Sequence, residues 1–547
     1  MQIPEMKDYD ECARTFRWEL PPTFNFGADV IDAHARRNDK QALVWCNEAG
    51  DERRFLFSDI SRLSSQMSNL MLAQGLKKGD RVLVVLPRIP EWQIAMVACF
   101  KAGLIAIPCV EMLTDKDIGF RAAHSGAAGA ITTAPNASKF DGCDGVRARI
   151  LVDGEAPGWL PYALAAQQPP RFECATMGID EPALMFYTSG STGNPKGVLH
   201  AARALYTWRL SGAYWETFRE DDVTWCTADT GWAKAGTGIL IAPWSFGTSV
   251  FFFNGKFDPA KRLELLQRYK VSIFCAPATE FRHMVNAPVQ GYDLPALRLC
   301  VSAGESVNPE VVERWRHLAG VQLLDGYGQT ETLMTILNYP PMPVKAGSMG
   351  KPLPGCEFVL LDPDNRIVGD NQLGQFAMKL PNPQFMLGYW NEAQRTAQAT
   401  VELDSDRYWL TGDLGYRDAD GYLFYTSRAD DIISSAGYRI GPTEVENALI
   451  EHKAVLESAV VASPDPERGE VVKAFVVLHN GYEASEEMVK QLQEHVRRVT
   501  APYKYPRRIE FVDSLPKNPS GKLLRRVLRD QEYGGHCQLN RPRSSLG

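Results

Sequence analysis

Residues 187–200, YTSGSTGNPKGVLH, combine hydroxyl side chains, three glycines and one lysine in a short span. Hydroxyl groups, a lysine and the backbone N–H groups that glycine exposes are suited to phosphate oxygens. The pattern predicts a buried strand over 183–188 before this stretch, and a helix over 198–210 after it. A strand, a Gly-rich turn and a helix N-terminus would aim donors at one point. The stretch therefore indicates a nucleotide site.

The spacing within this stretch differs from two common nucleotide-binding motifs. A Walker A loop has four residues between its first glycine and a Gly-Lys-Ser/Thr sequence. Here Pro195 lies five residues past Gly190, and Lys196 is followed by Gly197. The pattern GxGxxG is not met either, so kinase-like, GTPase-like and dinucleotide-binding interpretations lose their main motif.

Four further stretches carry residues that could do chemistry. Each alone is typical of a turn, a charged surface or a loop before a basic helix. They are DGYGQTET (325–332), YWLTGDLG (408–415), TSRADDIISSAGYRIGP (426–442) and LPKNPSGKLLRR (515–526).

The composition is that of an ordinary globular chain long enough for more than one domain. Of 547 residues, 45% are hydrophobic and 23% charged. A net charge of −7 and a pI near 5.8 argue against nucleic acid as a partner. No signal peptide is evident, and no apolar run reaches the roughly 18 residues of a membrane helix. Eleven scattered cysteines without a CxxC pair predict reduced thiols in a cytoplasmic protein.

Alternating strands and helices must position these stretches. Strand 81–87, helix 91–103 and strand 104–110 form a βαβ unit, and a similar alternation fills 249–305. In such α/β domains ligands bind at the carboxyl ends of the strands. Residues 1–429 are predicted to form this large layered domain.

The pattern changes near residue 430. Thr443 and Glu446 have the spacing of a capping box at the start of a helix. Two β-rich runs and an amphipathic helix over 486–499 follow. We predict a compact α+β domain over 430–533 and an unstructured tail over 534–547.

In their order and spacing, the five stretches together resemble the core motifs of the adenylate-forming enzymes. These include acyl-CoA synthetases, luciferase-like enzymes and the adenylation domains of non-ribosomal peptide synthetases. The resemblance runs from about residue 30 to about residue 530, and DTGWAK, GYGQTE and TAPYKYPRRIEF are most similar to medium-chain acyl-CoA synthetases. It implies a multi-sheet α/β N-terminal domain, a small mobile α+β C-terminal domain, and ATP, Mg²⁺ and coenzyme A as reactants or cofactors.

The resemblance assigns roles around ATP. A carboxylate attacks the α-phosphorus and pyrophosphate leaves, so catalysis consists of positioning and charge stabilisation. Thr330 would contact the α-phosphate, Glu331 would bind Mg²⁺, and Asp413 with Arg428 would hold the ribose. The β- and γ-phosphates would be held by Thr188, Ser189, Gly190, Ser191, Thr192, Gly193 and Lys196. Adenine would lie between 304–306 and 325–327, with Tyr327 stacking on it, so the remaining nucleotide residues are Gly304, Glu305, Ser306, Asp325, Gly326, Gly328 and Gln329.

The C-terminal domain is expected to act in both halves of the reaction. Lys522 would bridge the substrate carboxylate and the α-phosphate. The domain would then rotate about Asp430, so that Ala436, Gly437 and Tyr438 line the tunnel for the CoA pantetheine. Arg439 would serve near the phosphates before rotation. Arginines expected to meet the CoA phosphates are Arg468, Arg498, Arg507 and Arg508.

The acid that is activated is less sharply indicated. The residues that lie where the family builds its acyl pocket are Trp232, Ala235, Gly236, Gly238 and Trp244, and some of them are expected to be core residues instead. Acetate-specific relatives have a Trp just before the motif glutamine, where this chain has Gly328. Small residues with aromatic walls suit an apolar chain or a small aryl ring.

Several alternatives stay open. The acid is a short or medium-chain fatty acid, or instead a branched or aryl acid, and the acceptor is CoA or instead a carrier-protein thiol. A non-catalytic protein on this fold should have lost Lys522, Glu331 or Asp413, and all three are present. An unrelated NTPase would make ADP rather than AMP. The chain is expected to work as a monomer or homodimer on small molecules.

Overall fold

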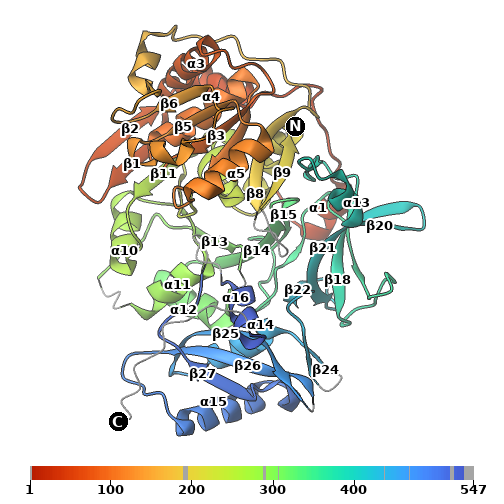
Figure 1. Cartoon of the computed structure of the whole chain (residues 1–547). Helices are drawn as coiled ribbons and strands as arrows, with labels where there is room; N and C mark the ends of the chain where they lie inside the picture. The colour runs from red at the N-terminus through yellow and green to blue at the C-terminus, as the bar shows by residue number, and fades with distance from the viewer. Residues whose placement is uncertain are drawn as a thin grey trace.

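The computed structural model describes residues 3–188, 195–287, 291–305, 307–435, 438–466, 468–517 and 523–534. Its strands and helices build a large N-terminal part and a smaller C-terminal domain, shown in blue in Figure 1. Within the described residues the strands form four sheets.

An eight-stranded sheet carries the two ends of the Gly-rich loop. Its central strands pair in parallel, while the β8–β9 and β9–β19 pairs are antiparallel. In spatial order the strands are β19 (Gly388–Tyr389), β9 (Lys196–Ala201), β8 (Pro182–Thr188), β4 (Ile105–Cys109), β3 (Arg81–Val85), β5 (Gly129–Thr132), β6 (Ala148–Leu151) and β7 (Leu160–Pro161).

A nine-stranded sheet carries the GYGQTE motif at the end of a parallel strand. Its order is β16 (Lys351–Pro352), β15 (Leu333–Leu337), β14 (Leu323–Gln329), β13 (Leu299–Ala303), β12 (Ile273–Cys275), β10 (Val223–Cys226), β11 (Ser249–Asn254), β1 (Gln41–Asn47) and β2 (Glu52–Leu56). One face packs Trp225 and Phe274 against the helices α10 (Pro259–Arg268), α11 (Ala278–Asn286) and α12 (Pro309–Ala319). The other face shares one core with the eight-stranded sheet.

Helices fill the layers between and outside these sheets. Helix α4 (Pro90–Ala102) is buried along its whole length, which explains its nearly continuous apolar sequence. The other helices near the sheets include α3 (Phe57–Ala73), α5 (Asp115–Ser125), α6 (Ala202–Thr207), α7 (Arg209–Tyr214), α8 (Ala233–Ala235), η4 (Gly236–Leu240) and α9 (Ile241–Ser245).

An antiparallel sheet joins the N-terminal part to the C-terminal domain. It holds β17 (Phe358–Leu361), β18 (Gly374–Leu380), β21 (Asp406–Arg417), β20 (Thr400–Leu403) and β22 (Leu423–Arg428). The C-terminal domain follows with β23 (Ile433–Ser435), β24 (Tyr438–Ile440), α14 (Pro442–Ile450), β25 (Val455–Asp465), β26 (Gly469–Leu478), α15 (Glu486–Val499), β27 (Arg508–Phe511) and α16 (Arg525–Glu532). In Figure 1, α14 and α16 lie on the side of this domain nearer the N-terminal part, and α15 lies on its far side.

The predicted α/β class and the βαβ unit over 81–110 are confirmed, and the two β-rich runs of the C-terminal domain form β25 and β26, which pair antiparallel. The helix predicted over 198–210 is wrong in its first part. Residues 196–201 form β9, which pairs with β8 as a hairpin, and the helix begins only at Ala202. The Gly-rich loop therefore joins two strands, and no helix N-terminus follows it directly.

The predicted capping box at Thr443 is also wrong. Helix α14 has Gly441 at its N-cap and Pro442 at its first position. Glu446 accepts hydrogen bonds from the backbone N–H of Val460 and from Arg525 instead, so it ties the helix to β25 and α16.

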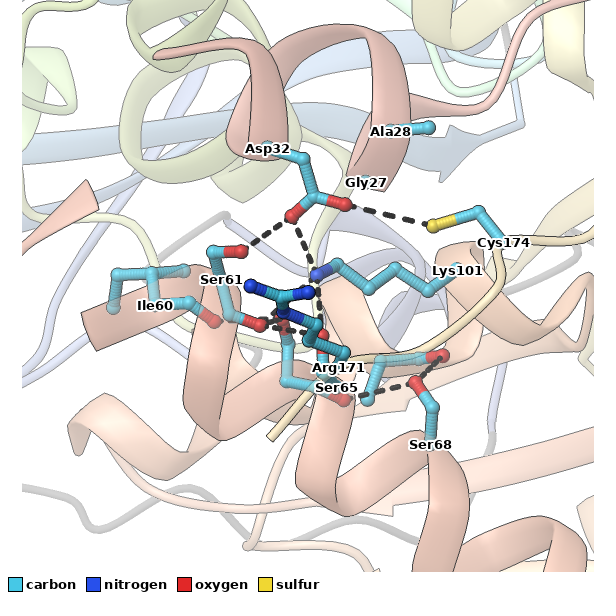
Figure 2. A network of polar contacts seen from close by, with 12 residues as sticks. Gly27, Ala28, Asp32, Ile60, Ser61, Ser65, Ser68, Lys101, Arg171 and Cys174 are labelled. Atoms are coloured by element: carbon cyan, nitrogen blue, oxygen red, sulfur yellow. Dashed lines mark hydrogen bonds and ion pairs between the residues drawn. The ribbon is translucent and has the colours of Figure 1, made fainter. Parts of the chain in front are cut away.

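A buried polar network fixes the first helices of the chain (Figure 2). The ammonium of Lys101 on α4 has no solvent exposure and lies 2.6 Å from Asp32 at the end of η1 (Gly27–Asp32). It also donates to the carbonyl of Ser61 and the hydroxyl of Ser65 on α3, each at 2.9 Å. Cys174 contacts the same aspartate at 3.7 Å. All three donor positions of the ammonium are thus used, as a buried charge requires.

Candidate active site

The two ends of the Gly-rich loop lie opposite each other. Thr188 ends β8 and pairs with Lys196 at the start of β9. The Thr188 hydroxyl is buried and has no hydrogen-bond partner among the described residues. Residues Ser189, Gly190, Ser191, Thr192 and Gly193 lie outside the described residues. A buried hydroxyl without a partner, beside a lysine, is a group that could hydrogen-bond an oxygen-rich ligand at this point.

The turn that holds Glu331 lies against the same strands. The hydroxyl of Tyr389 on β19 donates to Glu331 at 2.7 Å, and the Lys196 ammonium donates to this hydroxyl at 3.3 Å. Lys196 also lies 4.5 Å from the centroid of the Tyr389 ring. Burial lowers the pKa of Lys196, and Glu331 opposes this shift. Tyr389 therefore links the predicted metal ligand to the predicted phosphate-binding lysine.

A second cluster surrounds Asp413, whose side chain is buried. One of its oxygens accepts from the hydroxyl of Tyr327 at 2.5 Å and from Gln329 at 2.6 Å. The other accepts from Arg428 at 3.0 Å. Three of about four acceptor positions on this carboxylate are thus occupied. Tyr327 meets Asp413 through its hydroxyl, and its stacking on adenine remains a prediction.

The two segments predicted to hold adenine contain a glycine with a positive φ and two carboxylates that accept hydrogen bonds. Gly304 has a φ of 96°, which favours glycine, and the Glu305 carboxylate accepts from the Thr279 hydroxyl at 2.8 Å. Ser306 lies outside the described residues. Burial raises the pKa of Asp325 to about 7, although the backbone N–H groups of Val307 and Gly326 donate to its carboxylate.

Gly328 is fixed as glycine by its neighbours. A Cβ at this position would lie 2.0 Å from the carbonyl oxygen of Leu333. Leu333 itself has a φ of 58°, an uncommon conformation for a bulky residue. With the hairpin in this shape, position 328 has no room for the aromatic side chain that the acetate-specific relatives carry there.

The five residues predicted to line the acyl pocket fall into two groups. Gly236 and Gly238 approach other side chains closely, because a Cβ would lie 2.9 Å from Trp208 and 2.4 Å from Cys226, respectively. Ala235 is buried, and the Trp232 indole N–H is buried without a partner among the described residues. Trp244 instead donates to the carbonyl of Ala42 at 3.0 Å and packs against Phe57, which is the placement of a core residue.

The structure describes only part of the predicted C-terminal machinery. Lys522, Ala436 and Gly437 lie outside the described residues, and Arg439 is described only as part of β24. Tyr438 is 52% exposed and stacks on Tyr503 with ring centroids 4.4 Å apart. The carbonyl of Asp430, the predicted hinge, accepts from Arg529 on α16 at 2.5 Å.

The four arginines predicted to bind the CoA phosphates lie on the C-terminal domain, and they differ in the contacts that they already make there. Arg498 is exposed and contacts His495 at 3.2 Å, and Arg507 lies 5.1 Å from the Tyr505 ring. Arg468 is exposed. Arg508 donates to the Ser463 hydroxyl at 2.7 Å and pairs with Asp465, so its guanidinium already has partners within the domain.

Three residues of the site were missed in the sequence. Tyr389 lies far along the chain from both of its partners, in a short strand without a recognisable motif. His200 is fully buried and donates from Nε2 to the carbonyl of Thr330 at 2.7 Å, and burial lowers its pKa to about 4. Trp409 donates to Gln329 at 3.2 Å. His200 and Trp409 lie inside the quoted stretches, but nothing in their spacing marks them as neighbours of the GYGQTE turn.

Two family models match the chain. The model described as AMP-binding enzyme matches residues 31–390, and the one described as AMP-binding enzyme C-terminal domain matches residues 444–522. The chain belongs to this family of AMP-binding enzymes.

Similar proteins of known name, and others of known structure, support this family assignment. The chain is 39% identical to the mitochondrial acyl-coenzyme A synthetase ACSM3 of Mus musculus, over 96% of this chain and 93% of that protein. It is 40% identical to the human mitochondrial acyl-coenzyme A synthetase ACSM4, over 97% and 94%. Among solved structures, the anthranilate CoA ligase AuaEII with anthranoyl-AMP is similar, with a TM-score of 0.86, 30% identity and coverage of 94% and 98%. A benzoate CoA ligase from Burkholderia xenovorans LB400 has a TM-score of 0.82, 28% identity and coverage of 92% and 100%.

Proposed function

We propose that this AMP-binding enzyme joins a short- or medium-chain fatty acid, or instead a branched or aryl acid, to coenzyme A, with Lys522, Glu331, Thr330 and Lys196 as its catalytic residues. The general activity, AMP-forming ligation of an acid to CoA, follows from the family and from its acyl-CoA synthetase relatives. The proposal adds the class of acid and the roles of single residues.

The observation that carries the proposal is the convergence of two charged clusters. Tyr389 brings Glu331 and Lys196 together next to the free Thr188 hydroxyl. Tyr327 and Gln329 connect the neighbouring GYGQTE strand to Asp413. A triphosphate at the first cluster and a ribose at the second would place the α-phosphate between them, at Thr330.

The chemistry proceeds in two displacements. A carboxylate oxygen of the acid attacks the α-phosphorus, the bond to the β-phosphate oxygen breaks, and pyrophosphate leaves. The CoA sulfur then attacks the acyl carbonyl, AMP leaves with the bonding electrons, and the thiol proton is released. Lys196 and Lys522 are proposed to neutralise charge on the phosphate oxygens in the first displacement.

The residues present fit a bound Mg²⁺. Glu331 offers a carboxylate that Tyr389 connects to Lys196, the register partner of Thr188, and hard oxygen ligands suit this ion. When bound, Mg²⁺ supplies positive charge that stabilises the phosphate oxygens. Tyr389 would keep Glu331 oriented toward it.

The second displacement requires the CoA thiol to reach the site that Lys522 is proposed to occupy. Rotation about Asp430 would exchange the Lys522 segment for the β23–β24 hairpin. The exposure of Tyr438 supports this, because about half of its surface is open to solvent and available for a new contact. Arg498 and Arg507 are the better candidates for the CoA phosphates, since Arg508 already pairs with Asp465.

Two observations support the class of acid: the names of similar proteins, and the small residues of the predicted acyl pocket. ACSM3 and ACSM4 are named acyl-coenzyme A synthetases, whereas the two solved structures are anthranilate and benzoate CoA ligases. Both kinds of acid are compatible with the small residues at 235, 236 and 238.

Among the described residues no helix has the length and hydropathy to cross a membrane. The predicted cytoplasmic location and the monomeric or homodimeric state remain proposals.

Product analysis tests this function. Incubation with MgATP, CoA and butyrate, hexanoate, octanoate or benzoate should give AMP, pyrophosphate and the acyl-CoA in equal amounts. Formation of ADP and phosphate would contradict the proposal. Formation of acyl-AMP that is never passed to CoA would favour a carrier-protein acceptor.

A further inference from the structure

His200 on β9 is a buried histidine to which the proposed reaction gives no role. It has no solvent exposure, and its Nε2 lies 2.7 Å from the carbonyl oxygen of Thr330. Strand β9 begins at Lys196, so the strand that leaves the predicted phosphate loop also contacts the turn predicted to hold the α-phosphate. His200 therefore connects two parts of the site that are 130 residues apart in the chain.

The hydrogen bond to Thr330 fixes the protonation state of His200. A carbonyl oxygen can only accept, so Nε2 carries the proton and donates it. Nδ1 has no partner among the described residues, and burial lowers the pKa of His200 to about 4. At neutral pH the ring is therefore uncharged. A general acid or base needs a pKa nearer to neutral pH, so His200 is better suited to hold its neighbour than to transfer a proton.

The His200 ring is held in place by aromatic side chains. Its centroid lies 6.4 Å from the ring of Trp208 and 6.5 Å from that of Phe186. Trp208 is buried and donates from its indole N–H to the Thr237 hydroxyl at 2.7 Å. A donor whose own position is fixed by packing can fix the position of its acceptor.

The turn that His200 contacts is anchored through two successive carbonyl groups. It connects β14 to β15, beyond the register pair of Gln329 and Leu333. The Thr330 carbonyl accepts from His200, and the Glu331 carbonyl accepts from the backbone N–H of Met386, just before β19, at 2.9 Å. Thr330 itself is partly exposed, as a residue that contacts a ligand must be.

We propose that His200 is a positioning residue that holds Thr330 in the orientation in which its hydroxyl meets the α-phosphate. Without the hydrogen bond, the peptide group of Thr330 would be free to rotate and the hydroxyl would be displaced. Small displacements of a group that acts on the reacting atoms are costly in rate. This inference rests on the proposed acyl-CoA ligase function and on the role proposed there for Thr330.

Three substitutions separate the donor of His200 from its volume. His200→Gln keeps an N–H donor at about the reach of Nε2, His200→Asn has an amide too short to reach the carbonyl, and His200→Met has no donor. The rate to measure is a single turnover of pyrophosphate release without CoA, with hexanoate, octanoate or benzoate, because this isolates the first displacement. The Asn and Met variants should be about 10- to 100-fold slower than wild type, and the Gln variant less than about 5-fold slower. The control His34→Met changes a half-buried histidine that packs on Phe57, and it should keep the wild-type rate.

A double-mutant cycle tests whether His200 acts through Thr330. Thr330→Val removes the hydroxyl and keeps the carbonyl. In this background there is no hydroxyl to orient, so adding His200→Met should slow the reaction by less than about 3-fold further. A merely structural role predicts that the two losses multiply, because independent changes in free energy add. The cycle is run with His200→Asn if the Met variant does not fold.

Three results would overturn the inference. One is a His200→Met or His200→Asn enzyme that folds, as judged by its thermal unfolding, and keeps the wild-type rate. Another is a folded His200→Gln enzyme as slow as the variants without a donor in reach. The third is a double variant in which the two losses multiply. Each leaves the proposed ligase function intact as long as wild type converts some acid and CoA to the acyl-CoA, whereas a wild type that converts none would count against the function itself.

Discussion

At the scale of single residues, the site is held together by side chains that bond to one another across sheets. Tyr389 lies on the edge of the eight-stranded sheet, while Glu331 lies on the turn that ends β14. The Tyr389 hydroxyl stays protonated, because burial and the nearby Glu331 both raise the pKa of Tyr389 above its usual range. It can therefore donate to Glu331 at neutral pH.

Removing this hydroxyl tests its positioning role. Tyr389→Phe should lower kcat for acid-dependent pyrophosphate release about 10- to 100-fold, as expected for a lost hydrogen bond to a charged group. A positioning role also predicts that the loss is partly recovered at high Mg²⁺ concentration. The control Tyr416→Phe alters a ring that stacks on Phe424 in the antiparallel sheet, and it should keep the wild-type rate. A Tyr389→Phe enzyme with unchanged kcat at every Mg²⁺ concentration would argue against this role.

Asp325 gives a prediction about pH and stability. Its pKa is about 7 in the folded protein against 3.8 in an unfolded chain, so folding favours the protonated form. Its contribution to stability is therefore present at acidic pH and is lost as the pH rises from about 4 to about 7. In urea unfolding, wild type should lose more stability between pH 5 and pH 8 than Asp325→Asn. Equal losses in the two proteins would contradict the assignment, and the exposed control Asp364→Asn should behave as wild type.

At the scale of elements, local patterns predicted the strands and helices of the α/β layers well. Unbroken apolar runs with β-branched residues gave β3 and β4, and periodic apolar positions gave α15. The helix expected at 198–210 failed because its first residues are apolar at positions that suit either a strand or a helix. Pairing with β8 decides for the strand, and that pairing is a tertiary effect that a short window does not contain.

Tertiary contacts, which a short stretch of sequence does not contain, also explain why some site residues were missed. Glu331, Asp413 and Lys196 were predicted through the resemblance of the five stretches, taken together in their order and spacing, to the motifs of adenylate-forming enzymes. Tyr389, His200 and Trp409 are set apart only by their hydrogen-bond partners in the folded chain. Surroundings of this kind depend on the packing of sheets that are distant in sequence.

The network of Lys101 gives a prediction at the level of helices. Lys101→Met should lower the free energy of unfolding by about 3 kcal/mol or more, because it leaves Asp32 without its buried counter-ion. The control Lys78→Met breaks an ion pair with Glu181 in which both side chains are 43% exposed, and it should cost less than about 1 kcal/mol. Denaturant unfolding of the two variants measures the difference. Equal costs would mean that the buried pair contributes no more than the exposed one.

At the scale of the whole molecule, the account depends on two domains that share one site. The N-terminal part supplies the nucleotide-binding clusters, and the C-terminal domain is proposed to supply Lys522 for one step and the β23–β24 hairpin for the other. At the proposed hinge, Arg428 on β22 lies 3.8 Å from the carboxylate of Asp430, and rotation would change this ion pair. Arg529 holds the carbonyl of Asp430 and the side chain of Asp431, and these contacts lie within the segment that would rotate.

The most direct test of the central claim is acid-dependent pyrophosphate release from MgATP, with and without CoA, by wild type and Lys522→Ala. We expect wild type to turn over repeatedly only when CoA is present, and the variant to be slower by about 100-fold or more. Lys517→Ala, five residues earlier and bonded to Glu457 in the structure, should stay close to wild type. A Lys522→Ala enzyme with the wild-type rate, or a wild type that produces ADP, would contradict the claim that this chain activates acids through an acyl-AMP formed at the shared site.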